Sequence, residues 1–177
     1  MTLTEKIVAV HLRLDAADVP HAFGGALALA WCTQRARGTI DIDLNVFVPP
    51  GDAARVRDAL TGDVTVDDAA LVAIDRDGQA RAWFGDTPVD LFFNTTPFHE
   101  RAAQRARHEP FAGRVVPFLS CDDIAVFKAF FNRTKDWADL EEMIGAGTVD
   151  IDRVIGTLRR YLPDGDGVID RLIGLAR

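Results

Sequence analysis

The chain has 177 residues, of which 48% are hydrophobic and 27% are charged, an ordinary composition for a globular protein with a core of its own. No stretch approaches the roughly 20 apolar residues of a membrane span, and the N-terminal segment lacks the apolar core of a signal peptide, so we expect a cytoplasmic protein with no membrane partner. The formal net charge of −7 argues against broad nucleic-acid binding, which needs many Lys and Arg side chains.

Hydrophobic periodicity and breaker residues predict the elements of the first half of the chain. In chain order these are helices over residues 3–17 and 24–34, a strand over 40–48, a helix over 52–60, strand pieces over 64–66 and 71–74, a hairpin turn over 76–79 and a returning strand over 80–84. The strand over 40–48 has the clearest signal, because polar and apolar residues alternate along it before Pro49-Pro50-Gly51.

The second half of the chain is mostly helical by the same criteria. In chain order it should contain a strand over 87–93, a helix over 97–107, a short strand over 115–119, helices over 121–132, 134–144 and 150–161, and a last helix through Leu175. Ser120 is a candidate N-cap for the helix over 121–132. Strands thus cluster centrally, with helices before and after, which predicts an α+β protein with a mixed β-sheet. We expect an α/β core over residues 1–119, flanked by helices, and a C-terminal helical subdomain over 120–177 packed on it.

Asp41 and Asp43 lie two residues apart in the strand over 40–48, so their side chains should point to the same face. Two carboxylates one pleat apart repel each other and resist burial unless a cation lies between them. Their hard oxygen ligands suit Mg²⁺, which prefers one or two carboxylates together with substrate phosphates, and Mn²⁺ is a possible substitute. A strand whose polar face is simply solvated is the other interpretation.

Asp90 interrupts an apolar strand, where an Asp rarely lies without a partner. It is either an Asp at a strand end that a backbone amide caps, or a third metal ligand or general base beside Asp41 and Asp43. The second interpretation requires the strands over 40–48 and 87–93 to lie close together.

Gly24 and Gly25 precede an apolar helix. Glycines at such a place let backbone N–H groups approach an anion closely, and the helix N-terminus adds partial positive charge. The pair therefore indicates a phosphate-binding loop, with a plain tight turn as the alternative.

Three other features have both an ordinary and a functional interpretation. Lys128 interrupts an apolar helix, and it either packs its alkyl chain on the core or reaches a phosphate. The basic segment, defined as Arg101, Arg105, Arg107, His108 and Arg114, is either a solvated helix face or a surface for phosphates. The two cysteines, Cys32 and Cys121, are too few for a disulfide framework and lack metal-ligand spacing, so we expect small core residues.

Together, Gly24-Gly25, the run Arg37-x-Thr39-x-Asp41-x-Asp43 and the lone Asp90 resemble the nucleotidyltransferase fold of the DNA polymerase β superfamily. Within that superfamily the chain is most similar to the bacterial proteins grouped with the abortive-infection AbiEii toxins. That likeness extends to the helix with Lys128 and to the stretch over residues 133–140, and it spans about residues 20 to 145.

The resemblance implies a role for each matching residue. It assigns metal binding and catalysis to Asp41, Asp43 and Asp90, and nucleotide binding to Gly24, Gly25, Arg37, Thr39 and Lys128, with Lys135 as a substitute for Lys128. Many nucleotidyltransferases have Gly-Ser in this loop, whereas here Ala26 follows two glycines, so any phosphate contact would be made by backbone amides.

The hypothesis from sequence is a Mg²⁺-dependent nucleotidyltransferase. It would move a nucleoside monophosphate from an NTP, such as ATP, to a hydroxyl of RNA (tRNA), a protein or a small molecule. If the toxin likeness holds, an antitoxin protein is an expected partner. The main alternative is a non-catalytic nucleotide-binding or protein-interaction module on the same fold, and a phosphotransferase is a third possibility.

Overall fold

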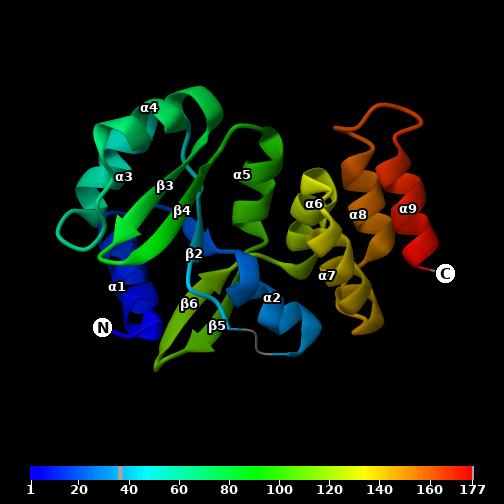
Figure 1. Cartoon of the computed structure of the whole chain (residues 1–177), viewed down its shortest axis with the longest axis horizontal. Helices are drawn as coiled ribbons and strands as arrows, with labels where there is room; N and C mark the ends of the chain where they lie inside the picture. Colours follow the sequence, from blue (N-terminus) through cyan, green and yellow to red (C-terminus); the bar gives the residue numbers. More distant parts are fainter. Residues whose placement is uncertain (36–37, 177) are drawn as a thin grey trace. The chain divides into compact units, whose positions relative to one another are not determined.

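The computed structural model describes residues 1–35 and 38–176, which form two compact units. The first unit comprises Met1–Leu27 and Gly38–Leu119, and the second comprises Ala28–Arg37 and Ser120–Arg177. Helix α2 (Gly25–Thr33) begins in the first unit and continues into the second (Figure 1). Within the described ranges, no helix is both long and apolar enough to cross a bilayer.

The first unit contains the β-sheet. Its strands are β1 (His21–Phe23), β2 (Ile42–Val46), β3 (Gln79–Phe84), β4 (Thr87–Phe93), β5 (Arg107–Phe111) and β6 (Arg114–Phe118). Its helices, besides the start of α2, are α1 (Leu3–Ala16), the 3-10 helix η1 (Pro50–Asp52), α3 (Ala53–Leu60), α4 (Asp68–Asp77) and α5 (Pro97–Gln104).

The sheet is mixed, and in the described part of the chain its strand order is β3-β4-β2-β1-β6-β5. β2 runs parallel to β4 and β1 runs parallel to β6, whereas the other neighbours are antiparallel. The short connections β3–β4 and β5–β6 are hairpins, and the two parallel pairs bring together strands that are far apart in sequence. The predicted α+β class with a mixed sheet is confirmed.

One face of the sheet is apolar and carries the core of this unit. Alternate residues of β2 and β4 are fully or almost fully buried, namely Ile42, Leu44, Val46, Val89, Leu91 and Phe93. Helix α3 packs against α1 and α4, and α4 packs against β3 (Figure 1). The alternation leaves Asp43 and Asp90 on the opposite face of the same strands.

Residues 64–77 correct the prediction from sequence. The strand piece over 71–74 and the hairpin turn over 76–79 are wrong, because α4 covers residues 68–77. The strand piece over 64–66 is reduced to a single antiparallel bridge between Thr65 and Trp83 of β3. Asp67 is its N-cap and accepts a hydrogen bond from the Ala70 amide at 2.7 Å. Gly78, at φ 72°, ends the helix as a left-handed C-cap instead of forming a hairpin.

Lys6 fixes the β3–β4 hairpin from helix α1. Its side chain is almost buried, and Nζ donates to the Phe84 carbonyl at 3.1 Å, the Asp86 carboxylate at 2.8 Å and the Thr87 hydroxyl at 2.7 Å. A buried ammonium with three acceptors holds this turn in one geometry. The hairpin in turn sets the register of β4, the strand of Asp90.

His21 is buried in β1 with both ring nitrogens in hydrogen bonds. Nδ1 lies 2.8 Å from the Val19 carbonyl, which can only accept, so Nε2 accepts from His11 Nδ1 at 2.9 Å. The pKa of His21 is lowered from 6.5 to about 4, mainly by burial and in smaller part by the nearby His11, although the hydrogen bond to Val19 opposes the shift. These rings line a cavity of about 650 Å³ together with His108.

We expect this histidine to make the fold acid-sensitive. The pKa of His21 is lower in the folded state than in the unfolded state. The contribution of neutral His21 to the free energy of unfolding is therefore complete above pH 6.5 and is lost as the pH falls toward 4. Urea unfolding should show a loss of about 2–3 kcal/mol from this residue across that window. In His21→Leu the free energy of unfolding should start lower at pH 7.5 but change less with pH. An unchanged pH slope in that variant would contradict the assignment.

The second unit is helical. Besides the end of α2 it contains α6 (Cys121–Phe131), α7 (Thr134–Gly145), α8 (Ile151–Leu158) and α9 (Gly167–Leu175). Helix α6 packs against the other three (Figure 1). The predicted cap of α6 is present, because the Ser120 hydroxyl accepts from the Asp123 amide at 3.2 Å. Asp122 joins α6 to α8, since its carboxylate accepts from the Asp150 amide at 2.9 Å.

A disulfide between Cys32 and Cys121 links α2 to α6 within this unit. The expectation of two small core residues is right about burial but missed the bond, because local sequence cannot bring together cysteines that are 89 residues apart. Closing so long a loop restricts the unfolded chain, which typically stabilises a protein by about 2–4 kcal/mol.

Reduction should therefore lower the free energy of unfolding by about 2–4 kcal/mol. The measurement is urea unfolding of protein purified without reductant, with and without a phosphine reductant. The Cys32→Ala/Cys121→Ala variant should match the reduced protein and should not respond to reductant. Two titratable thiols in the denatured, unreduced protein would show that the bond is absent.

Candidate active site

Asp43 and Asp90 lie side by side on neighbouring strands. β2 and β4 pair in parallel with Asp43 opposite Asp90, so the two side chains share the polar face of the sheet. Asp41 directly precedes β2, two residues before Asp43. The condition that the sequence prediction set for Asp90, a nearby strand, is therefore met.

Thr39 orients Asp41. Its hydroxyl donates a short hydrogen bond to the Asp41 carboxylate and also accepts from the Asp41 amide at 3.4 Å. This contact holds the carboxylate at the entrance to β2. Thr39, predicted to bind nucleotide, thus acts on the acidic residue itself in this structure.

Arg81 was not singled out from the sequence, yet it lies at the centre of the acidic face. On β3 it is opposite Asp90, and its Nε and Nη2 donate to the two Asp90 oxygens at 2.7 and 2.8 Å. These hydrogen bonds raise the pKa of the Arg81 guanidinium, and the charges of Asp41 and Asp43 raise it further. All three carboxylates therefore act on one guanidinium. The sequence gives no sign of this role, because Arg81 looks like any exposed polar residue of a strand. The pairing of β3 with β4 is what places it opposite Asp90.

Gly24 and Gly25 bring the backbone against Asp43. The Gly24 backbone amide donates to the Asp43 carbonyl at 2.9 Å, and a Cβ added at Gly24 would lie 2.9 Å from the side-chain Nδ2 of Asn45. Gly25, at φ 52°, begins α2, and a Cβ there would overlap the Asp43 carboxylate. The double glycine is thus required by close packing at the N-terminus of a helix, where partial positive charge faces an acid.

Asp41, Asp43 and Asp90 have the side-chain chemistry of a divalent-cation site, but they are not arranged around a common point where an ion could bind. Hard carboxylate oxygens share one sheet face, and a guanidinium already provides positive charge among them. Across residues 1–35 and 38–176, however, no group of three or more His, Cys, Asp or Glu side chains is arranged to hold a metal ion. Asp90 is bound by Arg81 through both oxygens, and the Asp41 carboxylate accepts from Thr39. Metal binding by Asp41, Asp43 and Asp90 stays a prediction.

Lys128 lies in the second unit, within an acidic network. Its Nζ lies 2.5 Å from Asp139 and 3.5 Å from Asp136, and Arg133 donates to Asp136 at 2.6 Å. Burial raises the pKa of Asp136, but the hydrogen bonds from Arg133 and the charge of Lys128 more than offset it, so its pKa lies below the ordinary value. The lysine is therefore a partner of two buried carboxylates in this structure.

Two further residues predicted to bind nucleotide are Lys135 and Arg37. Lys135 is exposed in the first turn of α7. Arg37 lies outside the described residues. A phosphate contact by Lys128, Lys135 or Arg37 stays a prediction.

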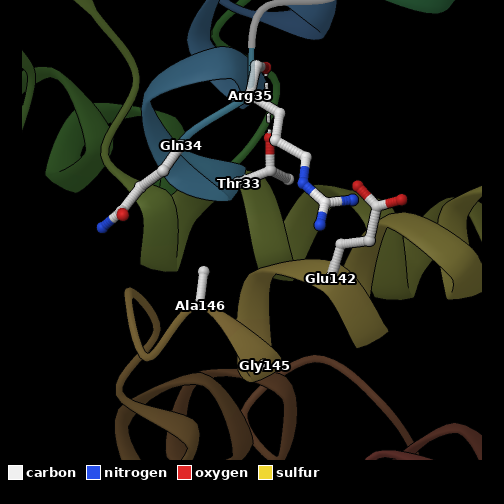
Figure 2. A pocket seen from close by; sticks show the side chains of 6 residues that line it. All are labelled: Thr33, Gln34, Arg35, Glu142, Gly145 and Ala146. Atoms are coloured by element: carbon white, nitrogen blue, oxygen red, sulfur yellow. Dashed lines mark hydrogen bonds between the residues drawn. The ribbon is translucent and has the colours of Figure 1, made fainter.

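A small pocket of about 440 Å³ lies in the second unit, between the end of α2 and the end of α7 (Figure 2). It is lined by Thr33, Gln34, Arg35, Glu142, Gly145 and Ala146. In Figure 2 the Arg35 guanidinium and the Glu142 carboxylate point toward one another. None of these six residues is among those predicted to form the site.

Comparison with known proteins identifies the fold. No family model matches the sequence, and no curated protein matches it either. A solution structure of the antibiotic-resistance factor ANT(2'')-Ia gives a TM-score of 0.60 at 18% identity, covering 89% of this chain and 92% of that one. A crystal structure of ANT(2'')-Ia in complex with adenylyl-2''-tobramycin gives 0.61 at 17% identity, covering 98% of each chain.

The chain has a nucleotidyltransferase fold. A nucleotidyltransferase-like protein from Paracoccidioides brasiliensis is also similar, with a TM-score of 0.50 at 17% identity, covering 95% of this chain and 92% of that one. The resemblance to the nucleotidyltransferase fold is therefore confirmed. The closer likeness to the AbiEii toxins stays a prediction, because identities this low establish the fold alone.

Proposed function

We propose that this protein is a nucleotidyltransferase that moves a nucleoside monophosphate from an NTP to a hydroxyl group, with Mg²⁺ or Mn²⁺ as cofactor. The observation that supports this most is the register that sets Asp43 beside Asp90, with Gly25 packed against Asp43. The nucleotidyltransferase fold supports it as well, since one similar structure is a complex with an adenylylated aminoglycoside.

At phosphorus the reaction forms one bond and breaks one, and the acceptor hydroxyl loses its proton. The acceptor oxygen bonds to the α-phosphorus, the bond from that phosphorus to the oxygen bridging to the β-phosphate breaks, and pyrophosphate leaves. The acceptor proton passes to a base, a role that Asp90 would fill unless it serves as a further metal ligand. Bound Mg²⁺ would neutralise charge on the triphosphate. Asp41 and Asp43 would hold that ion, and the Thr39 hydroxyl would keep Asp41 oriented toward it.

The backbone at Gly24-Gly25 would complete the nucleotide site. With no side chain at either position, N–H groups at the start of α2 can approach a phosphate beside Asp43. Because Ala26 follows, this contact would depend on the backbone and the helix dipole alone.

The acceptor is the least constrained part of the proposal. The fold neighbour with an aminoglycoside product favours a small hydroxyl-bearing molecule. The AbiEii resemblance favours tRNA or a protein, with an antitoxin as partner, and the net charge of −7 would confine contacts with tRNA to a local surface such as the basic segment.

The test is transfer of label from each of the four α-labelled NTPs, with Mg²⁺ or Mn²⁺. The acceptors are tobramycin and other aminoglycosides, total tRNA and a protein extract. We expect a labelled product and released pyrophosphate with at least one pair of substrates, and neither with a chelator. Absence of product in every combination would argue against the enzyme.

A non-catalytic nucleotide-binding module is the second candidate. The specific observation in its favour is that Arg81 occupies both oxygens of Asp90. Calorimetry with Mg²⁺ and a non-hydrolysable NTP separates the two: binding without transfer supports the module, and absence of binding rejects both.

A further inference from the structure

Arg81 places a positive charge where the proposed mechanism requires a cation. Its guanidinium binds both oxygens of Asp90, which lies opposite Asp43 on the neighbouring strand. Each Asp90 oxygen keeps a second lone pair, but the guanidinium charge weakens both the affinity of this carboxylate for a metal ion and its basicity toward an acceptor hydroxyl. Asp90 is therefore a stronger metal ligand and a stronger base once Arg81 has left it.

The location of Arg81 allows that release. β3 is the outermost strand on its side of the sheet, and the Arg81 side chain is 53% exposed, compared with 22% for Asp90. A half-exposed ion pair contributes little net stability, so exchanging one anionic partner for another requires little free energy. Phosphate oxygens match the planar, two-pronged donor geometry of a guanidinium as well as a carboxylate does.

We propose that Arg81 is an internal counter-cation of the acidic site, which neutralises Asp90 in the free protein and moves to a triphosphate oxygen when the metal–NTP complex binds. This inference rests on the proposed function. Arg81 acts on Asp90 in the free protein and on the triphosphate in the complex, and this exchange couples metal binding to nucleotide binding. A divalent cation alone should bind weakly, because the guanidinium charge on Asp90 lies next to Asp43 and repels a second cation.

The first experiment measures Mn²⁺ binding to the full chain by electron paramagnetic resonance, without nucleotide. Arg81→Gln should bind Mn²⁺ about tenfold more tightly than the unmodified protein, because a competing charge is removed. Arg81→Lys keeps the charge and should stay close to the unmodified protein. Arg76→Gln is the matched control, because Arg76 also pairs with an aspartate, Asp77, and should leave the affinity unchanged.

The second experiment separates this role from a structural one. With nucleotide present, Arg81→Gln should raise KM for the NTP about tenfold, because a phosphate contact is lost, and Arg81→Lys should restore part of it. Thermal unfolding should show that all variants are folded. Equal Mn²⁺ affinity in Arg81→Gln and the unmodified protein would overturn the inference.

The two proposals can fail separately. If the unmodified protein transfers nucleotide but Arg81→Gln changes neither Mn²⁺ affinity nor KM, the role of Arg81 is wrong and the enzyme stands. If no variant binds Mn²⁺ with or without NTP, both proposals are wrong.

Discussion

Replacing Asp43 with Asn should reduce kcat/KM for nucleotidyl transfer by at least about 1000-fold. Asp43 lies at the centre of the proposed site, opposite Asp90 and against Gly25. Asn keeps the shape of the side chain but removes the charge that would hold the metal ion on the triphosphate. The measurement is the transfer assay under saturating Mg²⁺, with Mn²⁺ affinity as a second readout that should fall in parallel.

The same change should have a small effect on stability. Asp43 lies opposite Asp90, whose charge Arg81 already pairs, so Asp43→Asn should change the free energy of unfolding by no more than about 1 kcal/mol. Asp75→Asn is the matched control, an exposed aspartate on α4 that should affect neither activity nor metal binding. If Asp43→Asn keeps more than a tenth of the activity, the acidic pair is not the metal site.

Replacing Gly25 with Ala should disturb both the fold and the site. At φ 52° an L side chain is strained, and the added Cβ would overlap the Asp43 carboxylate, so Asp43 or the start of α2 must shift. We expect a loss of about 2–4 kcal/mol in the free energy of unfolding. Activity should fall about 100-fold, because a displacement of about 1 Å in a catalytic group has that effect.

Gly156→Ala is the control for this prediction. Gly156 lies inside helix α8 with open space around its Cα, so alanine should stabilise the protein by up to about 1 kcal/mol and leave transfer unchanged. Urea unfolding and the transfer assay on both variants give the comparison. A lower free energy of unfolding in Gly25→Ala and a higher one in Gly156→Ala would support the close approach of Gly25 to Asp43. Equal changes in the two variants would contradict it.

The sequence was sufficient for the parts of the fold that local chemistry determines. The alternation around Asp43 predicted β2, and Ser120 predicted the start of α6, because periodicity and caps act within a few residues. The strand β1 was missed, since its three residues are all buried and show no alternation. Helix α4 was mistaken for strands, because its Asp67 cap and its Gly78 end resemble turn signals.

The sequence likewise predicted only those parts of the site that local chemistry determines. The acidic residues stood out because charged side chains in apolar strands need a partner. Their partner did not stand out: Arg81 faces Asp90 only through the β3–β4 register, and Asp43 faces Asp90 only through the parallel pairing of strands more than forty residues apart. The bond between Cys32 and Cys121 was missed for the same reason, since long-range pairing leaves no local pattern.

The path of the chain through the two units limits how the protein can be dissected. The second unit needs Ala28–Arg37 as well as Ser120–Arg177, and Cys32 and Cys121 come from these two separate segments. A fragment that ends at Leu119 would hold a thiol without its partner, and the complementary fragment would lack the turns of α2 that belong to it. All segments of the first unit have been translated once Leu119 is reached, whereas the second unit completes its structure only after translation has gone well beyond that residue, and its two segments must come from one polypeptide.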